Sequence, residues 1–327
     1  MSGTAPGYWL GFDLGGTKML ATVFDSDFSS VGRKRKKTKA YRGQETGLAR
    51  MVQTARKAIE DAGIMPSQLQ GIGVGSPGPL DLNEGVILDT PNLGWRNAPL
   101  KATLEAEFGC PAVIMNDVDA GVYGEYRFGA GQGARCLLGV FPGTGIGGGC
   151  VYDGTILRGR VNSILEIGHM QVQPEGPLCG CGRRGCLEAV ASRLAIASAA
   201  AAAAYRGEAP HLLENSGMDL SNIRSGALAD AVTNGDSAVE TIVRQAAAWL
   251  GVGIGNTVNL LGPDVVVLGG GLVEALPELF LEEVTQSAKA CVMPVFESTF
   301  DVRVSRLTDD ATVAGAAAWA QEEIGTG

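Results

Sequence analysis

The stretch Gly11–Lys18, GFDLGGTK, joins two segments, Tyr8–Asp13 and Met19–Phe24, that are rich in apolar, β-branched and aromatic residues. This composition predicts a strand, a tight glycine turn and a second strand. The stretch nearly fits the P-loop pattern, but its threonine and lysine are in reversed order and a strand follows where that motif needs a helix. A glycine hairpin can still present backbone N–H groups and a hydroxyl to a phosphate, and Asp13 can hold Mg²⁺ directly or through water. An ordinary β-hairpin is the alternative.

The same plan returns later in the chain. A strand over Arg135–Phe141 leads into PGTGIGGG at residues 142–149, and Cys150–Tyr152 continues as a strand. The chain is therefore predicted to be an internally duplicated α/β protein in which two glycine turns clamp a polyphosphate. Two GxGxxG matches, at 73–78 and 143–148, lead into a hairpin and a strand. A dinucleotide site needs a helix at that point, which argues against a nicotinamide dehydrogenase.

Hydrophobic spacing predicts alternating strands and helices in the rest of the chain, and two domains. We expect a smaller α/β lobe over residues 1–120 plus about 311–327, because the last helix should pack back on the first domain. The larger lobe then covers residues 121–310 and includes a cysteine loop at 166–188. The expected helices are 46–62, 100–108, one from 117, 187–205, 237–261 and 311–323, and the later strands are 69–75, 112–115, 265–268 and 302–305.

The cysteine loop, EIGHMQVQPEGPLCGCGRRGCLE, holds one of only two histidines and three of only seven cysteines. A single tetrahedral zinc could collect all four side chains, and four protein ligands make such a site structural. The alternatives are a disulfide or buried free thiols, but thiols one residue apart are poorly placed to bridge each other. The four predicted metal ligands are His169, Cys179, Cys181 and Cys186.

Asn116 and Asp117 follow a predicted strand and open a helix, so either residue could cap that helix. In an open α/β sheet, a carboxylate at this position also points into the ligand crevice, where it can take a proton from a substrate hydroxyl. The helix N-terminus should favour its ionised form. Glu166 and Glu188 flank the cysteine loop and could accept hydrogen bonds from a polyhydroxylated ligand.

Charge and composition exclude other classes of partner. With 327 residues and 45% hydrophobic residues the chain can bury a large core, and its net charge of −9 argues against a nucleic-acid surface. The basic run at 33–39, RKRKKTK, is expected to be a solvated sheet edge, with an acidic docking partner as the alternative. The N-terminus shows no signal-peptide pattern and no long apolar run follows, so we expect a cytoplasmic protein without a membrane partner.

Together, several motifs resemble the ROK family of repressors, open reading frames and sugar kinases. The resemblance runs from about residue 11 to ATVAGAA at 311–317, and the cysteine motif follows the family spacing without a gap. It implies an actin-like ATPase (ribonuclease H-like) fold with two lobes around a cleft, and family members are commonly dimers or tetramers. The motifs are DLGGTK (13–18), GVGSPGPLD (73–81), PNLGW (91–95), NDVDA (116–120), PGTGIGGG (142–149) and EIGH(x9)CGCGxxGCLE (166–188).

The resemblance also implies roles for individual residues. Asp117 would be the catalytic base, and His169 would serve both zinc and sugar. The implied sugar-binding residues are Gly78, Asn92, Asn116, Asp117, Glu166, His169 and Glu188. The implied ATP-binding residues are Asp13, Gly15, Gly16, Thr17, Lys18, Gly143, Thr144, Gly145, Gly269, Gly270 and Gly271.

Two classes of protein share this body: sugar kinases and sugar-responsive transcriptional regulators. Regulators carry a DNA-binding domain ahead of the first hairpin, where this sequence has about ten residues, so we expect a kinase using Mg²⁺ and ATP. The segments GSPGPLD and PNLGW look like those of glucokinases and favour phosphorylation of the 6-hydroxyl of glucose. Kinases of N-acetylmannosamine, N-acetylglucosamine, mannose or fructose stay open, as does a polyphosphate donor.

Overall fold

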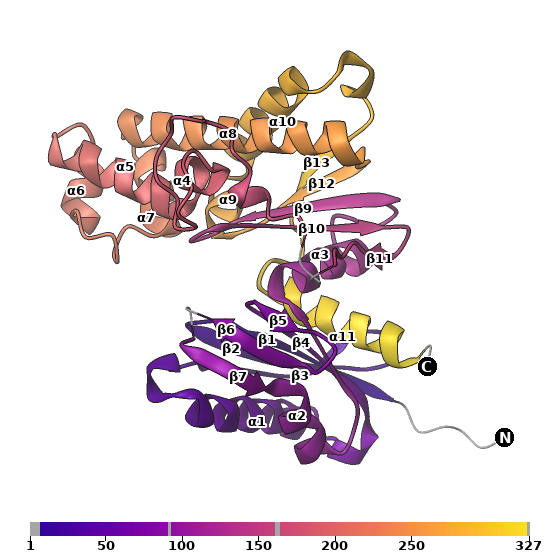
Figure 1. The fold of residues 1–327 in the computed structure, drawn as a ribbon. Helices are drawn as coiled ribbons and strands as arrows, with labels where there is room; N and C mark the ends of the chain where they lie inside the picture. The colour runs from indigo at the N-terminus through magenta and orange to yellow at the C-terminus, as the bar shows by residue number, and fades with distance from the viewer. Residues whose placement is uncertain (1–6, 91–92, 161–163, 326–327) are drawn as a thin grey trace. The chain divides into compact units, whose positions relative to one another are not determined.

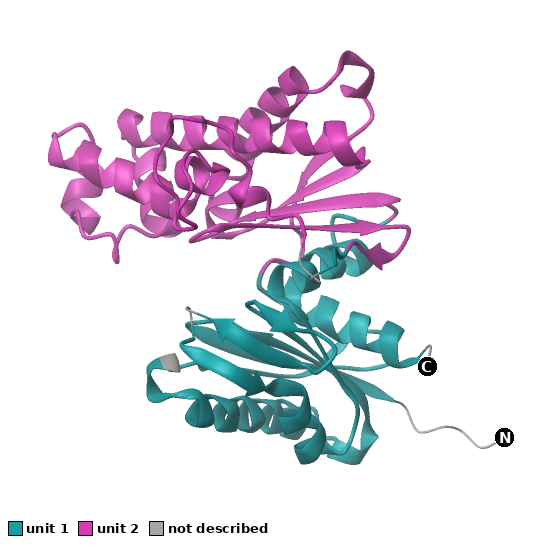
Figure 2. Cartoon of the chain, in the orientation of Figure 1, with its two compact units in different colours: residues 1–132, 158–163, 309–327 teal, residues 133–157, 164–308 magenta. Residues whose placement is uncertain are grey.

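The computed structural model describes residues 7–90, 93–160 and 164–325. The chain forms two compact units, each built from discontinuous segments (Figure 2). Unit 1 comprises 1–132, 158–163 and 309–327, and unit 2 comprises 133–157 and 164–308. The expected boundary at residue 120 falls inside a helix, so the first unit extends further along the chain than expected. The first unit also includes a short segment near residue 160.

Unit 1 is centred on a five-stranded sheet of order β3-β2-β1-β4-β8. β1, β2 and β3 are antiparallel neighbours, whereas β4 and β8 run parallel to β1. The basic run lies on β3, an edge strand, as expected. A second sheet of order β5-β6-β7 lies in the same unit. The strands are β1 Tyr8–Leu14, β2 Lys18–Phe24, β3 Ser30–Lys37, β4 Leu69–Ser76, β5 Leu80–Asp81, β6 Val86–Thr90, β7 Trp95–Pro99 and β8 Ala112–Asn116.

Helices cover both faces of the five-stranded sheet in unit 1 (Figure 1). Apolar side chains of β1 and β2 pack with those of α1 in one core cluster. On the other face, glycines let α11 approach closely: a Cβ at Gly11 would lie 1.9 Å from the Val313 carbonyl oxygen. The helices are α1 Gln44–Asp61, α2 Leu100–Phe108, α3 Asp117–Phe128 and α11 Ala311–Gly325, with the 3₁₀ turns η1 Ala40–Arg42, η2 Pro66–Gln68 and η5 Thr308–Asp310.

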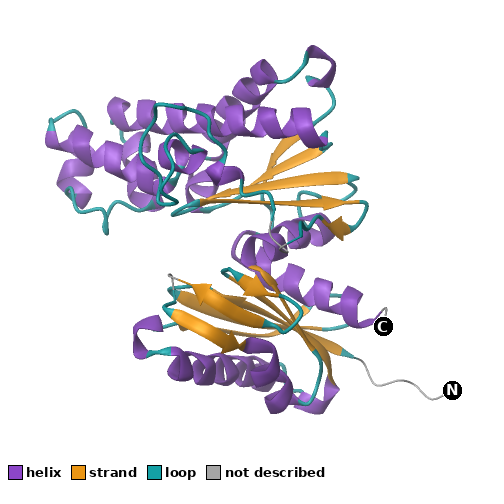
Figure 3. Ribbon diagram, viewed as in Figure 1, coloured by secondary structure: helices purple, strands orange, loops and turns teal. Residues whose placement is uncertain are grey.

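Unit 2 repeats this topology in a sheet of order β11-β10-β9-β12-β13. Again the first three strands of the unit are antiparallel neighbours and the last two run parallel to the first. The predicted duplication therefore holds strand by strand in the two sheet orders, and Figure 3 shows the strands and helices of both units. The strands are β9 Cys136–Pro142, β10 Ile146–Tyr152, β11 Thr155–Ile156, β12 Val265–Leu268 and β13 Asp301–Val304.

The helices of unit 2 pack around α8, whose apolar face joins buried strand residues in a second core cluster. The helix expected over 187–205 is interrupted at Ser192, which is extended and caps a new helix by accepting a hydrogen bond from the Ala195 amide. No helix in the described ranges is long and apolar enough to cross a bilayer. The helices are α4 Leu187–Ala191, α5 Arg193–Tyr205, α6 Pro210–Ser216, α7 Ser225–Thr233, α8 Ser237–Leu261, α9 Gly271–Ala275 and α10 Pro277–Cys291, with η3 Ile167–His169 and η4 Pro294–Phe296.

Candidate active site

The glycine turn between β1 and β2 is held in shape by hydrogen bonds. The Gly15 amide donates to the Lys18 carbonyl (3.0 Å), and the Thr38 amide donates to the Thr17 carbonyl (2.9 Å). The Thr38 hydroxyl donates to the Gly15 carbonyl at 2.6 Å. The side chains of Thr17 and Lys18 are exposed at this turn. The turn can therefore present a hydroxyl and an ammonium group to an anion from a fixed backbone.

Lys18 also has an acidic partner that its position in the sequence does not reveal. Its Nζ lies 2.8 Å from Asp309 Oδ1, and Arg35 of β3 lies 2.8 Å from Asp309 Oδ2. These cations hold the pKa of Asp309 below its usual range. Arg33 pairs with the neighbouring Asp310 at 2.6 Å. Part of the basic run is thus neutralised by the acidic residues that precede α11.

Asp13 and Asp117 lie at the same edge of the unit 1 sheet. Asp13 is near the end of β1 and Asp117 directly follows β8. Because β1, β4 and β8 are parallel, their carboxyl ends meet at one edge, where α/β proteins bind ligands. Asn116 caps α3, since its side-chain oxygen accepts hydrogen bonds from the Val118 and Asp119 amides. The sequence allowed either Asn116 or Asp117 to cap this helix, and the structure assigns the cap to the Asn116 side chain.

Burial makes these two carboxyl groups difficult to ionise. Burial, followed by the charge of Asp117, raises the pKa of Asp13 to about 7. Burial also raises the pKa of Asp117, although the Val118 amide, which donates to Asp117 Oδ1 at 3.0 Å, opposes this shift. The amides at the helix N-terminus do favour ionised Asp117, as expected, but desolvation outweighs them and the pKa is raised. Two neighbouring carboxyls at this edge could hold a cation and accept a proton.

We expect Asp13→Asn to stabilise the metal-free protein at pH 8. A carboxyl whose folded pKa is raised contributes stability at low pH that is lost as the pH rises through about 7. The variant avoids this loss, so its gain in the free energy of unfolding should grow from near zero at pH 4 to at most about 4 kcal/mol at pH 8. Denaturant unfolding at both pH values measures it, with the exposed Asp89→Asn as the control. An equal difference at both pH values would contradict the burial argument.

The glycine turn between β9 and β10 depends on two residues from outside the turn. The Gly143 amide donates to the Gly145 carbonyl at 2.7 Å, which closes the turn. Glu188 Oε2 accepts a hydrogen bond from the Ile146 amide at 3.1 Å. A Cβ at Gly145 would lie 2.4 Å from this carboxylate oxygen, so a larger residue there would displace the Glu188 side chain. On the other side, Arg193 donates its backbone amide to the Gly143 carbonyl at 2.9 Å.

The third glycine segment, Gly269–Gly271, lies beside this turn. It connects β12 to α9, and the Gly269 amide donates to the Val140 carbonyl of β9 at 3.1 Å. A Cβ at Gly270 would come within 2.5 Å of the Pro142 carbonyl oxygen, and Gly270 has φ of 100°. The structure therefore brings the two glycine segments of unit 2 together at the carboxyl ends of β9 and β12, where a nucleotide phosphate could bind.

The four predicted metal ligands converge in unit 2. Their ligand atoms all lie within 4.8 Å of one another. Cys179 Sγ is 3.6 Å from His169 Nδ1, and Cys181 Sγ is 3.7 Å from Cys186 Sγ. A tetrahedral zinc with Zn–S bonds of about 2.3 Å and Zn–N bonds of about 2.0 Å needs edges of about 3.8 and 3.5 Å. The side chains present thus fit a zinc ion, and all seven cysteines of the described chain carry free thiols.

The cysteine loop is connected to the second glycine turn by Glu188. While Glu188 Oε2 holds the Ile146 amide, Glu188 Oε1 lies 3.6 Å from Cys179 Sγ. Gly185 permits the fold of this loop, because its φ is 71° and a Cβ there would lie 1.5 Å from the Gln173 carbonyl oxygen. A predicted sugar-binding carboxylate therefore has a structural role between the metal ligands and the turn.

The remaining predicted site residues have simpler positions. Glu166 is at the N-cap of η3 and lines an apolar cavity of about 210 Å³. Gly78 lies in the connection between β4 and β5. Asn92 lies outside the described residues. The structure groups the first turn, Asn116 and the two aspartates in unit 1, and the other two glycine segments, Glu188 and the cysteine cluster in unit 2.

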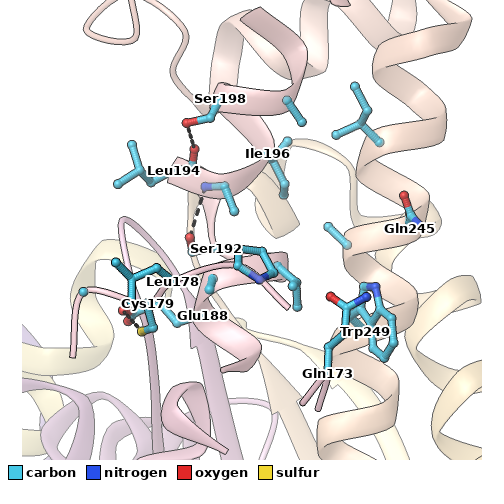
Figure 4. Close-up of a pocket in the computed structure, with 18 of the residues that line it drawn as sticks. Gln173, Leu178, Cys179, Glu188, Ser192, Leu194, Ile196, Ser198, Gln245 and Trp249 are labelled. Atoms are coloured by element: carbon cyan, nitrogen blue, oxygen red, sulfur yellow. Dashed lines mark hydrogen bonds between the residues drawn. The ribbon is translucent and has the colours of Figure 1, made fainter. Parts of the chain in front are cut away.

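A cavity of about 570 Å³ opens in unit 2 between the cysteine loop and the helices α4, α5 and α8 (Figure 4). Cys179 and Glu188 lie on one side of it, and Gln245 and Trp249 of α8 lie on the other. Thr144 of the second glycine turn also lines it. Among the predicted sugar-binding residues, Glu188 lines this cavity, but Glu166 and His169 do not. The cavity therefore does not bring the predicted sugar-binding residues together.

Two sheets of one topology, with a glycine turn in each and paired carboxyls at a sheet edge, define an actin-like ATPase fold. The chain belongs to the ROK family, whose model matches residues 9–323. The family and the fold predicted from the sequence motifs are thereby confirmed.

Known relatives of this family include both enzymes and regulators. The chain is 33% identical to a glucokinase of Thermotoga maritima over 317 residues, covering 97% of this chain and 98% of that protein. A ROK family glucokinase from Streptomyces griseus, solved in complex with glucose and AMPPNP, superposes with a TM-score of 0.83 at 32% identity and covers 97% of this chain and 100% of that chain. A xylose repressor of Caldicellulosiruptor bescii is 29% identical over 79% of this chain and 64% of its own length.

Proposed function

We propose that this protein is an ATP-dependent hexokinase that transfers the γ-phosphoryl group to the 6-hydroxyl of an aldohexose, namely glucose. The observation that carries the proposal is the placement of two half-buried carboxyls, Asp13 and Asp117, at the carboxyl edge of the unit 1 sheet, where the parallel strands β1 and β8 end. Similarity to glucokinases over nearly the whole chain supports glucose as the sugar and ATP as the donor.

In this proposal Asp117 is the catalytic base. Its carboxylate accepts the proton of the sugar hydroxyl as that oxygen attacks the γ-phosphorus in line. Burial raises the pKa of Asp117, which makes its carboxylate a stronger proton acceptor. Asn116 uses its side-chain oxygen as the helix cap, which leaves its amide N–H groups to donate to a sugar oxygen.

The glycine turns bind the phosphates with their backbone amides and hydroxyls. Phosphoryl transfer depends mainly on position and charge neutralisation, and hydrogen-bond donors on rigid turns provide both. Mg²⁺ bound near Asp13 would supply further neutralising charge, which would offset the burial and the neighbouring Asp117 that raise the pKa of Asp13. Lys18 must exchange its ion pair with Asp309 for a phosphate oxygen if it binds ATP directly.

We assign sugar recognition to the residues that the family motifs single out. Glu166, His169 and Glu188 would accept or donate hydrogen bonds to sugar hydroxyls, with Gly78 and Asn92 beside them. Glu188 keeps one oxygen on the Ile146 amide, and its other oxygen, which lies near Cys179 Sγ, would turn to the sugar. His169, Cys179, Cys181 and Cys186 would hold a structural zinc, since their spacing fits the edges of its tetrahedron.

A coupled ADP-release assay against hexoses and N-acetylhexosamines tests this proposal. We expect the highest kcat/KM with glucose, at least about tenfold above mannose, fructose, N-acetylglucosamine and N-acetylmannosamine, because one well-made polar contact discriminates by more than this factor. A second arm replaces ATP with polyphosphate. Preference for an acetamido sugar would overturn glucose as the substrate but keep the assignment of kinase activity. Sugar binding without turnover would instead indicate a sensor, as in the repressor relatives.

A further inference from the structure

Arg193 holds the second glycine turn by two separate hydrogen bonds. It is the first residue of α5, and its backbone amide donates to the Gly143 carbonyl at 2.9 Å. Its guanidinium Nη2 donates to the Thr144 hydroxyl at 2.8 Å. Ser192 is buried and caps α5, so the backbone from which Arg193 extends is fixed. The side chain is therefore positioned at the turn by its surroundings.

The charge of Arg193 is not neutralised within the described part of the chain. No carboxylate lies within ion-pair distance of it there, and its Nε and Nη1 donate no hydrogen bond to any described residue. The cations at the first glycine turn differ, because Lys18 and Arg35 share Asp309. A guanidinium that uses one donor on a neutral hydroxyl keeps a planar edge for a second acceptor.

The contact also determines what Thr144 can do. A hydroxyl that accepts a hydrogen bond from a guanidinium directs its own proton elsewhere, so Thr144 becomes a donor. Thr144 is exposed, and the nearest atom to a Cβ built on the preceding Gly143 is 3.8 Å away. The turn thus offers a hydroxyl proton, backbone amides and a cation without a carboxylate partner in the described residues. This combination of donors matches the phosphate oxygens of a nucleotide.

We propose that Arg193 binds the phosphate chain of the nucleotide directly and orients the Thr144 hydroxyl toward it. The inference rests on the proposed function, in which the second glycine turn meets ATP. The motif that identifies the second glycine turn, PGTGIGGG at 142–149, does not include Arg193. It adds a cationic residue to the nucleotide site of unit 2, where the turn otherwise contributes only neutral donors.

Three variants separate the charge of Arg193 from its hydrogen bond. Arg193→Ala removes both, Arg193→Gln keeps a donor without charge, and Arg193→Lys keeps the charge without the planar fork. Arg206→Ala is the matched control, because Arg206 is the C-cap of the same helix and pairs only with Glu208 among the described carboxylates. Calorimetric titration with ADP and Mg²⁺ gives Kd, and initial rates give KM for ATP and for glucose.

We expect Arg193→Ala to raise the Kd for ADP and the KM for ATP by about tenfold, with the KM for glucose within about twofold. Arg193→Lys should recover part of the loss, Arg193→Gln should stay weak, and Arg206→Ala should match the wild type. An ADP Kd within about twofold of wild type in Arg193→Ala, or in Arg193→Gln if the alanine variant does not fold, overturns the inference.

Two further measurements identify the source of any failure. If wild-type protein neither binds ADP nor phosphorylates a sugar, the proposed function fails and the inference fails with it. If wild type does both and Arg193→Ala matches it, only the inference fails. Titration of Arg193→Ala with glucose 6-phosphate tests the other source of phosphate. If this variant binds the product more weakly than wild type does while its ADP binding is unchanged, the assignment of Arg193 to the nucleotide is overturned.

Discussion

Asp117→Asn is expected to lower kcat by at least about 10²-fold while the Kd for glucose changes by less than about threefold. The amide has nearly the shape of the carboxylate, so it keeps the contacts to the sugar but accepts no proton from the hydroxyl. Because Asn116 caps α3, the substitution does not remove the helix cap. Rapid-mixing or coupled-assay kinetics give kcat, and calorimetry gives sugar binding.

The pH profile gives an independent readout of the same residue. Burial raises the pKa of Asp117, so wild-type turnover should fall as the pH is lowered through that pKa and the base becomes protonated. The residual activity of Asp117→Asn should lack this acidic limb. Asp89→Asn, which removes an exposed partner of Arg96, is the control and should keep both kcat and profile. A variant Asp117→Asn with near-normal kcat would exclude the base assignment.

Loss of one cysteine from the cluster is expected to have the second large effect. Cys181→Ala should reduce bound zinc from about one per chain to a small fraction, because removing a ligand weakens affinity by at least about 10²-fold. The Cys181 side chain is exposed, so its replacement leaves little buried volume unfilled. The expected fall of about 5 °C in the unfolding midpoint would then come from the metal. Metal analysis and thermal unfolding measure the two effects.

The contacts of Glu188 extend this prediction to nucleotide binding. Glu188 connects Cys179 with the Ile146 amide at the second glycine turn. A disordered metal loop should therefore also raise the KM for ATP. Cys291→Ala, outside the cluster, is the control for losing a thiol. If Cys181→Ala loses its zinc and keeps full stability and both KM values, the organising role of the loop is wrong.

Local signals were enough to predict the glycine turns, the repeated plan of strand, glycine turn and strand, and the cysteine cluster. Each depends on residues that are close in sequence: Gly15 to Lys18 form one turn, and all four metal ligands lie between residues 166 and 188. The adjacency of Asp13 and Asp117 could be predicted as well, because parallel strands place their carboxyl ends at one edge.

The partners of the site cations could not be predicted. The pairing of Lys18 with Asp309 joins residues 291 positions apart, and it exists only because η5 and α11 return to unit 1. Arg193 was missed for a different reason: a run of helix formers concealed the break at Ser192, which makes Arg193 the first residue of a helix. The net ionisation of Asp117 depends on burial, which no local pattern gives.

The return of α11 to unit 1 also affects the order in which the chain can fold during synthesis. The glycines of β1 and β4 are matched to the α11 backbone, yet this helix is made after all the other described helices and strands. All segments of unit 2 precede it, so unit 2 can complete its core on the ribosome while one face of the unit 1 sheet stays uncovered. The first half to be translated is therefore the last to be finished, and premature termination near the C-terminus removes a layer of the N-terminal unit.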